Sequence, residues 1–324
     1  MFLKSAKAAK ARQKVVRDHA SSGRRSESVL RKFLKSAKAA KARQKVVRDH
    51  ASSGRRSESV LRVFLKSTVM RFMLLLALAK GIVLSDLTWI EAEAILKPET
   101  VVVIPIGAES KEHGPHLRLR NDFVMAEYFK HQILESANVV VAPTVNYHYY
   151  PAFGEYPGST TLRLETARDL MVDICRSLAR FGPHRFYALN TGVSTMRALK
   201  PAAEILAADG ILFRYTDILK VGAEAEKQVK QQEGGTHADE IETSLMLYID
   251  PQSVDMHKAV KDYHVNEAGG LTRDPKKPGA YSATGVYGDA TLATRKKGEI
   301  MAKAMLEGML KEIESLRQSA LPNK

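Results

Sequence analysis

The six-residue run VVVIPI at 101–106 is the feature of this sequence that most restricts its fold. A continuous, β-branched apolar run of this length, bounded by turn-forming residues, is typical of a strand buried on both faces. Such a strand needs a parallel sheet that is covered by helices on each side. Ligands of open α/β sheets bind at the carboxyl ends of strands, so the run also locates a candidate site at its end.

The segments that follow alternate between strand and helix patterns, which predicts an α/β fold with a mainly parallel sheet. A first helix is expected from Asp86, which is a candidate N-cap. The predicted strands span 101–106, 138–145, 185–190 and 210–215, and the predicted helices span 122–136, 165–181, 195–209, 238–249 and 294–317. No phosphate-binding loop or dinucleotide-binding glycine pattern follows any of these strands.

The loop after the first strand carries Glu109, Glu112, His113, His116 and Asp122. Imidazole and carboxylate groups at such short spacing suit a divalent metal ion such as zinc or manganese. The alternative is a polar surface loop with two solvated histidines. The position of the loop at a strand end favours the metal site.

A second polar cluster, THADEIETS, spans 236–244 and opens a predicted helix. Its acidic residues either belong to a functional site or form an acidic first turn that complements the helix dipole. The dipole interpretation is favoured for Asp239 and Glu240. His237 and Glu242 are instead assigned to the site. A third stretch, Asn190–Thr195, follows the strand at 185–190, where it forms either part of the site or an ordinary strand-to-helix turn capped by Ser194 or Thr195.

The amino-terminal part differs in composition from the rest. Residues 2–31 are repeated identically at 33–62. Residues 1–63 hold 19 Lys and Arg against 4 Asp and Glu, so the net charge of the whole chain, +14, comes from this part. This basic extension, 1–69, has too few apolar residues for a core, so we expect it to be disordered or marginally helical and dispensable for folding. Binding to nucleic acid or to an anionic membrane, or a role in targeting, is the alternative.

A second candidate start lies at Met70. Met70 and Arg71 precede a short apolar run, and the segment 70–85 has the shape of a signal peptide. If the chain starts there, we expect a periplasmic or secreted protein, and otherwise a cytoplasmic one. The alternative for this segment is a buried helix, because the run is too short to span a bilayer.

Four stretches together resemble one known family. The stretch GAESKEHGPHLRLRND at 107–122 is similar to the signature of the creatininase (creatinine amidohydrolase) family. TWIEAEAIL at 88–96, THADEIETSLML at 236–247 and GVYGDATLATRKKGE at 285–299 resemble three further family stretches, in the same order. The resemblance covers 86–318, which we take as the catalytic domain, followed by a tail at 319–324.

The resemblance implies a three-layer α/β/α sandwich, a dinuclear zinc or manganese site and hydrolysis of a non-peptide C–N amide bond of a small molecule. It also implies a homo-oligomer, often a hexamer. His113 and Asp122 match metal ligands, with Asp122 in the place of the bridging carboxylate, and His237 matches a histidine beside the substrate. The predicted set is therefore Glu112, His113, Asp122 and Glu242 for the metal and His237 for catalysis.

This chain departs from the family pattern at two places that concern the metal. Lys111 stands where the family has its ligand Glu, two residues before His113, and Glu112 lies one residue later in a longer loop. The turn at 190–192 reads Asn-Thr-Gly, where the family has Asn-Gly-His with a metal-binding His. Three outcomes follow: one metal ion, an altered ligand set that uses His237 and Glu242, or an inactive relative that acts as a binding or scaffold protein.

Overall fold

The structure is a computed structural model that describes residues 81–265 and 270–323 of the 324-residue chain. The predictions for residues 1–69, and for most of the segment 70–85, lie outside the described residues. Among the helices of the described part, none combines the length and the apolar character that a membrane span requires.

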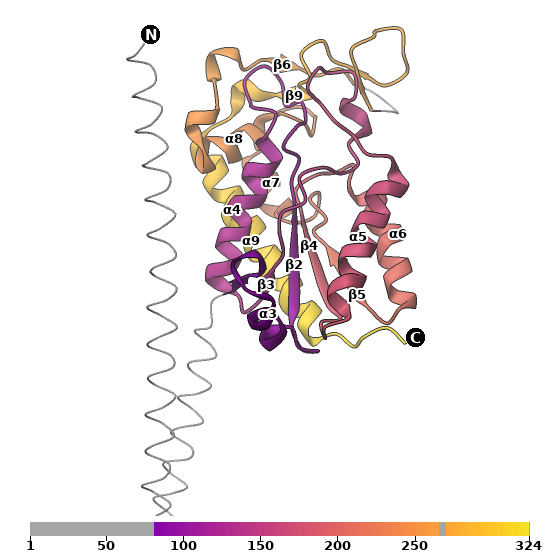
Figure 1. The fold of residues 1–324 in the computed structure, drawn as a ribbon. Coiled ribbons are helices and arrows are strands. Elements are labelled where there is room, and N and C mark those ends of the chain that lie inside the picture. Colours follow the sequence, from indigo (N-terminus) through magenta and orange to yellow (C-terminus); the bar gives the residue numbers. More distant parts are fainter. Residues whose placement is uncertain (1–80, 266–269, 324) are drawn as a thin grey trace, which may run out of the picture. The chain divides into compact units, whose positions relative to one another are not determined.

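A five-stranded parallel sheet forms the centre of the fold (Figure 1). Its strands, in spatial order, are β1 (Ile82–Val83), β3 (Val140–Val141), β2 (Val101–Ile106), β4 (Arg185–Asn190) and β5 (Leu212–Tyr215). Two small ribbons lie outside this sheet: β6 (Lys261–Asp262) pairs with β9 (Gly288–Asp289), and β7 (Leu271–Thr272) pairs with β8 (Ala280–Tyr281). The run VVVIPI forms a strand that is buried on both faces, as predicted. It is the middle strand of the sheet and pairs with β4 over its whole length.

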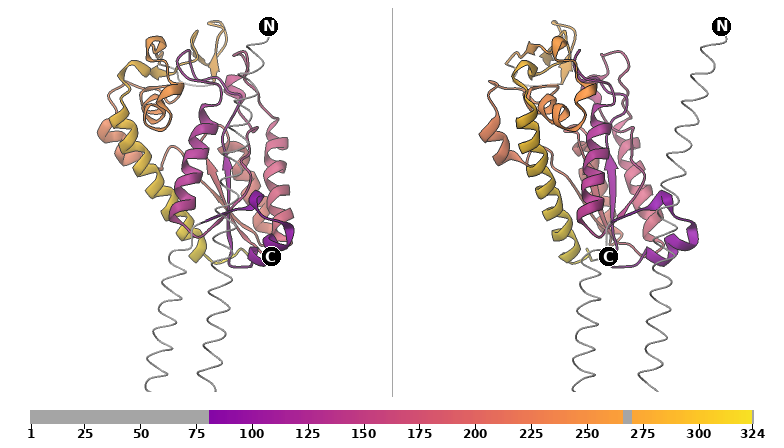
Figure 2. Two further views of the ribbon diagram at one scale, coloured as in Figure 1. Left: turned by 60° about the vertical axis from the view of Figure 1, so that its left-hand side comes forward. Right: turned by 90° about the vertical axis from the view of Figure 1, so that its left-hand side faces the viewer.

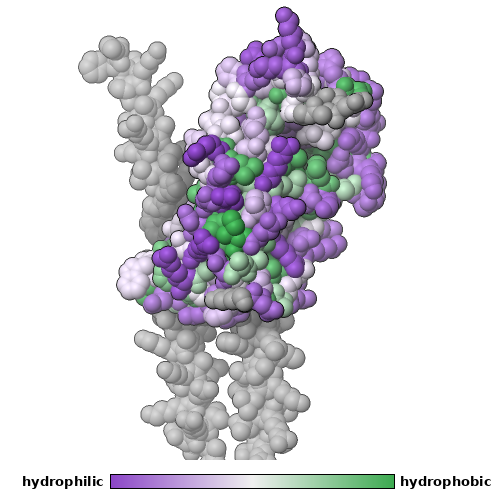
Figure 3. Space-filling view, turned by 90° about the vertical axis from the view of Figure 1, so that its right-hand side faces the viewer, coloured by the Kyte–Doolittle hydropathy of each residue, from purple (hydrophilic) through white to green (hydrophobic). Residues whose placement is uncertain are grey.

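Helices cover both faces of the sheet, which confirms the predicted α/β class. The helices are α3 (Trp89–Ile95), α4 (Asn121–Ser136), α5 (Leu164–Ala179), α6 (Met196–Ala208), α7 (Ala223–Val229), α8 (Glu240–Ile249) and α9 (Arg295–Gln318). Short 3-10 turns span Leu84–Asp86, Pro151–Phe153, Pro251–Ser253, Met256–Lys258 and Ala290–Leu292. α4 and α9 lie on one face and α5 and α6 on the other (Figures 1 and 2). Figure 3 shows the side of α5 and α6, where hydrophobic residues lie scattered among hydrophilic ones.

The alternation of side chains along β2 creates two separate cores. Val101 and Val103 belong to the core under α4, α8 and α9, whereas Val102, Ile104 and Ile106 belong to the core under α5 and α6. All five side chains are buried. Each contributes about 1.5–3 kcal/mol of burial free energy, so this strand anchors both layers and fixes the position of the loop that follows it.

Three local predictions differ from the structure. β3 is only two residues long, because Pro143 lacks a backbone N–H group and interrupts the ladder, although the N–H groups of Ala142 and Val145 still donate to β2. Thr88, not Asp86, is the N-cap of α3, where its side chain and that of Glu91 form a reciprocal capping box. α7 lies between the predicted strand at 210–215 and the predicted helix at 238–249, where the sequence predicted no helix.

The topology places a crevice at the carboxyl edge of the sheet. β2 continues into α4 on one face, and its neighbour β4 continues into α6 on the opposite face. Where two adjacent strands send their connections to opposite faces, the loops separate and leave room for a ligand.

Candidate functional site

A cavity of about 460 Å³ lies where the loop after β2, the turn after β4 and the start of α8 meet. Its polar wall includes Lys111, Tyr150, His237, Glu242 and the turn 191–194. The apolar part of its wall comes from α4, α8, α9 and the segment before α7, and includes Met125, Ile218, Val221, Leu245, Met301 and Met305. The cavity wall therefore combines charged groups with an apolar part.

His113 is held in one orientation by its two ring nitrogens. Nδ1 lies 2.8 Å from the carbonyl oxygen of Lys111, and because a carbonyl can only accept, Nδ1 carries the proton. Nε2 faces Asp122 Oδ1 at 2.7 Å and Glu242 Oε1 at 3.3 Å. Burial lowers the pKa of His113, but the two carboxylates outweigh burial and raise it to about 9.

Asp122, in the first turn of α4, has a basic partner on each oxygen. Oδ1 meets the ring of His113, and Oδ2 lies 2.6 Å from Nζ of Lys111. Burial alone would raise the pKa of Asp122, but the Lys111 ammonium and the His113 ring hold it below its usual range. Asp122 is therefore ionised at neutral pH and already neutralised by the chain itself.

Glu242 is positioned by the backbone that precedes α8. Ala238 adopts a left-handed conformation, with a φ of 48°, and its N–H donates to Glu242 Oε2 at 2.7 Å. Asn121 donates through Nδ2 to the other carboxylate oxygen, Oε1, at 3.0 Å. Non-glycine residues rarely adopt this conformation, and here the strained turn lets His237 and Glu242 face the same space.

His237 is fixed by a bridge to the stretch 285–289. The N–H of Tyr287 donates to the carbonyl of His237 at 2.9 Å, which holds the backbone in an extended form. The ring Nε2 lies 3.0 Å from the carbonyl oxygen of Glu112 and 3.1 Å from its Oε2, so Nε2 is the protonated nitrogen. Nδ1 is left facing Glu242 Oε2, at 3.6 Å.

Glu112 lies on the outer side of His237. Its carboxylate accepts from the N–H of Gly114 and from His237 Nε2. Gly285 packs directly against this carboxylate, and a side chain at 285 would collide with it. Outer partners of this kind fix the tautomer of a metal-binding histidine.

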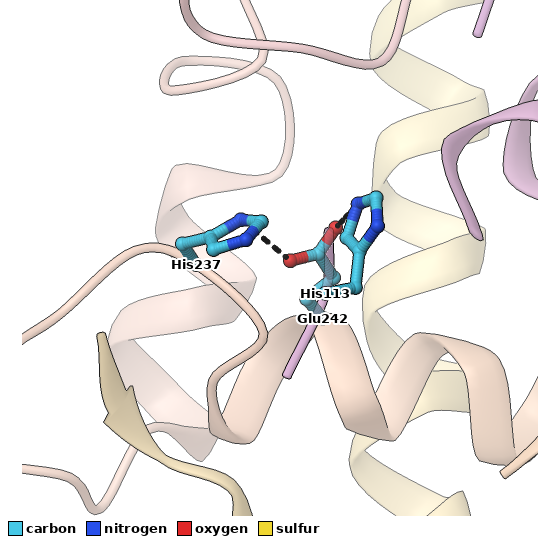
Figure 4. Close-up of side chains that lie close together, drawn as sticks. All are labelled: His113, His237 and Glu242. Atoms are coloured by element: carbon cyan, nitrogen blue, oxygen red, sulfur yellow. Dashed lines mark ion pairs between the residues drawn. The ribbon is translucent and has the colours of Figure 1, made fainter. Parts of the chain in front are cut away.

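His113, His237 and Glu242 together form a candidate metal site (Figure 4). One potential ligand atom from each lies within 4.8 Å of the other two. Figure 4 shows the Glu242 carboxylate between the two rings, with ion-pair contacts to both. Two imidazoles and one carboxylate are a donor set that zinc and manganese accept, so these residues fit one divalent ion. The structure brings Asp122 and Glu112 next to this group, each against one of its histidines.

The other residues that the sequence singled out have partners of their own. His116 Nε2 lies 2.7 Å from the hydroxyl of Thr243, and burial lowers the pKa of His116 to about 4. Glu109 accepts from the side chain of Asn146 at 2.8 Å. Asp239 caps α8 by accepting from the N–H groups of residues 241 and 242, as the dipole interpretation predicts.

The turn after β4 is held together by its own side chains. Asn190 donates through Nδ2 to the carbonyl of Gly192 at 2.7 Å, and the Thr195 hydroxyl donates to Asn190 Oδ1 at 2.5 Å. The Thr195 side chain therefore does not cap α6. The turn lines the cavity but offers no imidazole or carboxylate.

The sequence did not predict three residues of the cavity wall as site residues: Lys111, Tyr150 and Phe153. The ammonium of Lys111 lies 4.6 Å from the ring centre of Phe153 and 5.7 Å from that of Tyr150. Tyr150 is 2% exposed, and its hydroxyl has no hydrogen-bond partner among the described residues. The departure from the family pattern at Lys111 was a usable signal, whereas Tyr150 and Phe153 lie in a segment without a recognised motif.

Comparisons with known proteins show which family this chain resembles. The family model described as creatinine amidohydrolase matches residues 85–313. The creatinine amidohydrolase of Pseudomonas putida is 26% identical over 251 residues, which cover 72% of this chain and 96% of that protein. A mycofactocin precursor peptide peptidase of Mycolicibacterium smegmatis is 27% identical, over 66% of this chain and 84% of that protein.

A solved structure described as "Creatininase Mn" is also similar. It superimposes with a TM-score of 0.63 at 25% identity, and the match covers 74% of this chain and 100% of that one. The matched region contains the whole candidate site, because the family model spans the loop after β2, the start of α8 and the stretch that holds His237. The chain therefore belongs to the creatininase family.

Proposed function

We propose that this protein is a metal-dependent amidohydrolase that cleaves a non-peptide C–N amide bond of a small molecule. The observation that carries the proposal is the convergence of His113, His237 and Glu242, of which His237 and Glu242 line the cavity. Family membership supports hydrolysis as the reaction class. The geometry supports the cavity beside these three residues as the place of the reaction.

The side chains of the site have distinct parts in this proposal. His113 and His237 offer the nitrogens that face Glu242, and Glu112 keeps His237 in the required tautomer. A divalent ion bound there would supply Lewis-acid polarisation of the amide carbonyl. The prediction that His237 moves a proton stays untested, and the contacts of both its ring nitrogens favour a ligand role.

Tyr150 provides a hydrogen-bond donor for the substrate. Burial, and then the charge of Asp122, raises the pKa of Tyr150 well above its usual value, so the hydroxyl keeps its proton at neutral pH. A buried hydroxyl without a partner costs free energy, and a substrate carbonyl or amide oxygen would satisfy it. The hydroxyl therefore orients the scissile group against the candidate metal site.

The apolar part of the cavity wall bears on the choice of substrate. Methionine and branched side chains line it, and a small polar ring would leave this surface without contacts. We expect cyclic amides or formamides that carry an apolar substituent to be better substrates than unsubstituted ones. A preference for the smallest, most polar amides would contradict this.

The proposal is tested by a screen of cyclic amides and formamides with the full chain loaded with zinc or manganese. Turnover is expected, and it should disappear in Glu242→Gln. The matched control is Glu109→Gln, which alters a carboxylate of the same loop outside the candidate metal group. Absence of turnover throughout the screen, together with tight binding of one compound, would support an inactive binding protein instead.

We also propose a homo-oligomer. α3 exposes two large apolar side chains, with Trp89 75% and Ile90 60% exposed in the single chain. Exposed apolar groups on one short helix are typical of contact surfaces between copies. Light scattering after size exclusion gives the mass in solution, and Trp89→Glu should lower it if α3 lies in the interface.

A further inference from the structure

We propose that the ammonium group of Lys111 takes the place of a second metal ion, so that each chain binds one divalent cation. The inference rests on the proposed function for that one ion, which His113, His237 and Glu242 would hold. It goes further because it assigns to Lys111 the positive charge that a second metal ion would otherwise supply beside Asp122. Three independent observations support it.

The first observation is the position of the ammonium. Nζ of Lys111 lies 2.6 Å from Asp122 Oδ2, and the two side chains are 5% and 1% exposed. The rings of Phe153 and Tyr150 pack around the same ammonium. Asp122 occupies the position where the family resemblance places the bridging carboxylate. One of its oxygens meets His113 of the metal group and the other meets Lys111, so the ring and the ammonium share one carboxylate through different oxygens.

The second observation is the charge balance. The carboxylates of Glu112, Asp122 and Glu242 carry three formal negative charges, and Lys111 carries one positive charge. One divalent ion with neutral histidines makes this buried group neutral. A second divalent ion would leave an excess charge of +2 in a buried site beside an ammonium, which is strongly unfavourable.

The third observation is the supply of ligands. A second ion near Asp122 would need further donors, and the turn after β4 has only hydroxyl and amide side chains. The side chain of Asn190 is already bonded within that turn. Glu112 points to the outer nitrogen of His237, so the longer loop does not bring its carboxylate to Asp122. Among the described residues, one group of three or more imidazole, thiol or carboxylate side chains lies close enough together to hold an ion, and it is the group of His113, His237 and Glu242.

The lysine has a consequence for the cavity as well. A metal ion can leave, but an ammonium is covalently attached, so Asp122 keeps a positive partner in the metal-free protein. Lys111 also lines the cavity, where its fixed charge attracts a carbonyl or carboxylate oxygen of the substrate. The site thus combines one exchangeable cation with one permanent one.

The experiment measures metal stoichiometry in the full chain. The metal-free protein is dialysed against manganese, the metal per chain is measured by mass spectrometry, and the electron paramagnetic resonance spectrum is recorded. The wild type should hold one ion per chain and give the six-line spectrum of an isolated manganese. Lys111→Glu restores a carboxylate at this position, so it should take up a second ion and show spin coupling between the two.

Two control variants separate the effect of the lysine from that of general charge. Lys111→Met removes the ammonium without adding a ligand and should still hold one ion. Lys130→Glu makes the same charge change on the outer part of α4, where Lys130 pairs with Glu127 at 3.0 Å, and should also hold one ion.

The outcomes distinguish this inference from the proposed function. Two coupled ions in the wild type, with amide turnover, would overturn the role of Lys111 and leave the function intact. No bound metal and no turnover would overturn both. If Lys111→Glu keeps the wild-type circular dichroism spectrum and still holds one ion, the lysine does not determine the stoichiometry. If that variant does not fold, the number of manganese ions per wild-type chain and the wild-type resonance spectrum decide whether the site holds one ion or two.

Discussion

Lys111 and Asp122 form a buried ion pair in which Nζ lies 2.6 Å from Oδ2. Removing one partner of a buried pair leaves the other charge poorly compensated, which costs 3–5 kcal/mol in typical cases. We expect Lys111→Met to lower the free energy of unfolding by about 3 kcal/mol, because His113 remains as a second partner of Asp122. Urea denaturation of the metal-free protein measures this.

The double variant Lys111→Met with Asp122→Asn is the control for this pair. It removes both charges, so it should recover much of the lost stability. Strictly additive losses would show that the two side chains are not energetically coupled.

The two glutamates of the site should differ in their effect on metal binding. Glu242 lies between the two histidines, so Glu242→Gln should abolish uptake of zinc or manganese. Within the metal group Glu112 contacts the outer nitrogen of His237, so Glu112→Gln should weaken metal affinity by about 10–100-fold, as other outer partners do. Competition with a metal chelator gives both constants.

Equal losses in the two glutamate variants would place Glu112 among the ligands, as the sequence reading expected. His116→Gln serves as the control, since His116 is a buried histidine of the same loop that bonds to Thr243. It should keep its metal.

The Tyr150 hydroxyl should affect activity and stability in opposite directions. Tyr150→Phe removes a donor to the substrate, and we expect kcat/KM to fall by about 10-fold or more. The melting temperature should stay the same or rise, because the variant removes a buried hydroxyl that has no partner among the described residues. Unchanged kinetics on the best substrate of the screen would show that the hydroxyl does not contact it.

His148 should make stability depend on pH below neutrality. Burial lowers the pKa of His148 to about 4, against about 6.5 in an unfolded chain. Between these values the unfolded chain binds more protons, so stability falls as the pH is lowered from about 6.5 to about 4. The total loss is about 3 kcal/mol at most.

His148→Phe should therefore flatten the pH dependence of urea unfolding between pH 4 and 6.5 by this amount, relative to the wild type. His257→Gln, which changes an exposed histidine, should leave the pH profile as it is. Identical profiles for the wild type and His148→Phe would mean that His148 can be protonated in the folded protein.

Truncation should separate the extension from the domain. Residues 1–69 contain too few apolar side chains for a core, so a chain of 70–324 should melt within about 2 °C of the full chain. A chain of 86–324 also lacks β1, which pairs with β3, and the bond from the N–H of Gly81 to the carbonyl of Leu134 at 2.8 Å. Its melting temperature should fall by about 5 °C or more.

Calorimetry of the three chains measures these differences. A large loss in 70–324 would show that the extension contributes to the fold. Placement outside the cytoplasm also stays a prediction, and the mature amino terminus of the secreted fraction would test it.

Local patterns in the sequence were enough for the main elements of the fold. The β-branched run at 101–106 predicted the bounds of β2 and its burial on both faces, and the predicted strand at 185–190 has the bounds of β4. The strand predictions succeed because the burial of a strand on both faces depends on a run of neighbouring residues. The imidazole and carboxylate groups after β2 indicated a candidate site in that loop, and the role of these residues stays a prediction.

The tertiary structure decided which groups meet. Glu112 and His237 are 125 residues apart in the sequence. Only the folded chain shows that the Glu112 carboxylate contacts Nε2 of His237, while Nδ1 of the same ring faces Glu242. The pair of Lys111 with Asp122 likewise depends on the path of a loop that is one residue longer than the family pattern. A one-residue change in a loop redirects a side chain by several ångströms, and hydrogen bonds need an accuracy of tenths of an ångström, so local sequence cannot determine such contacts.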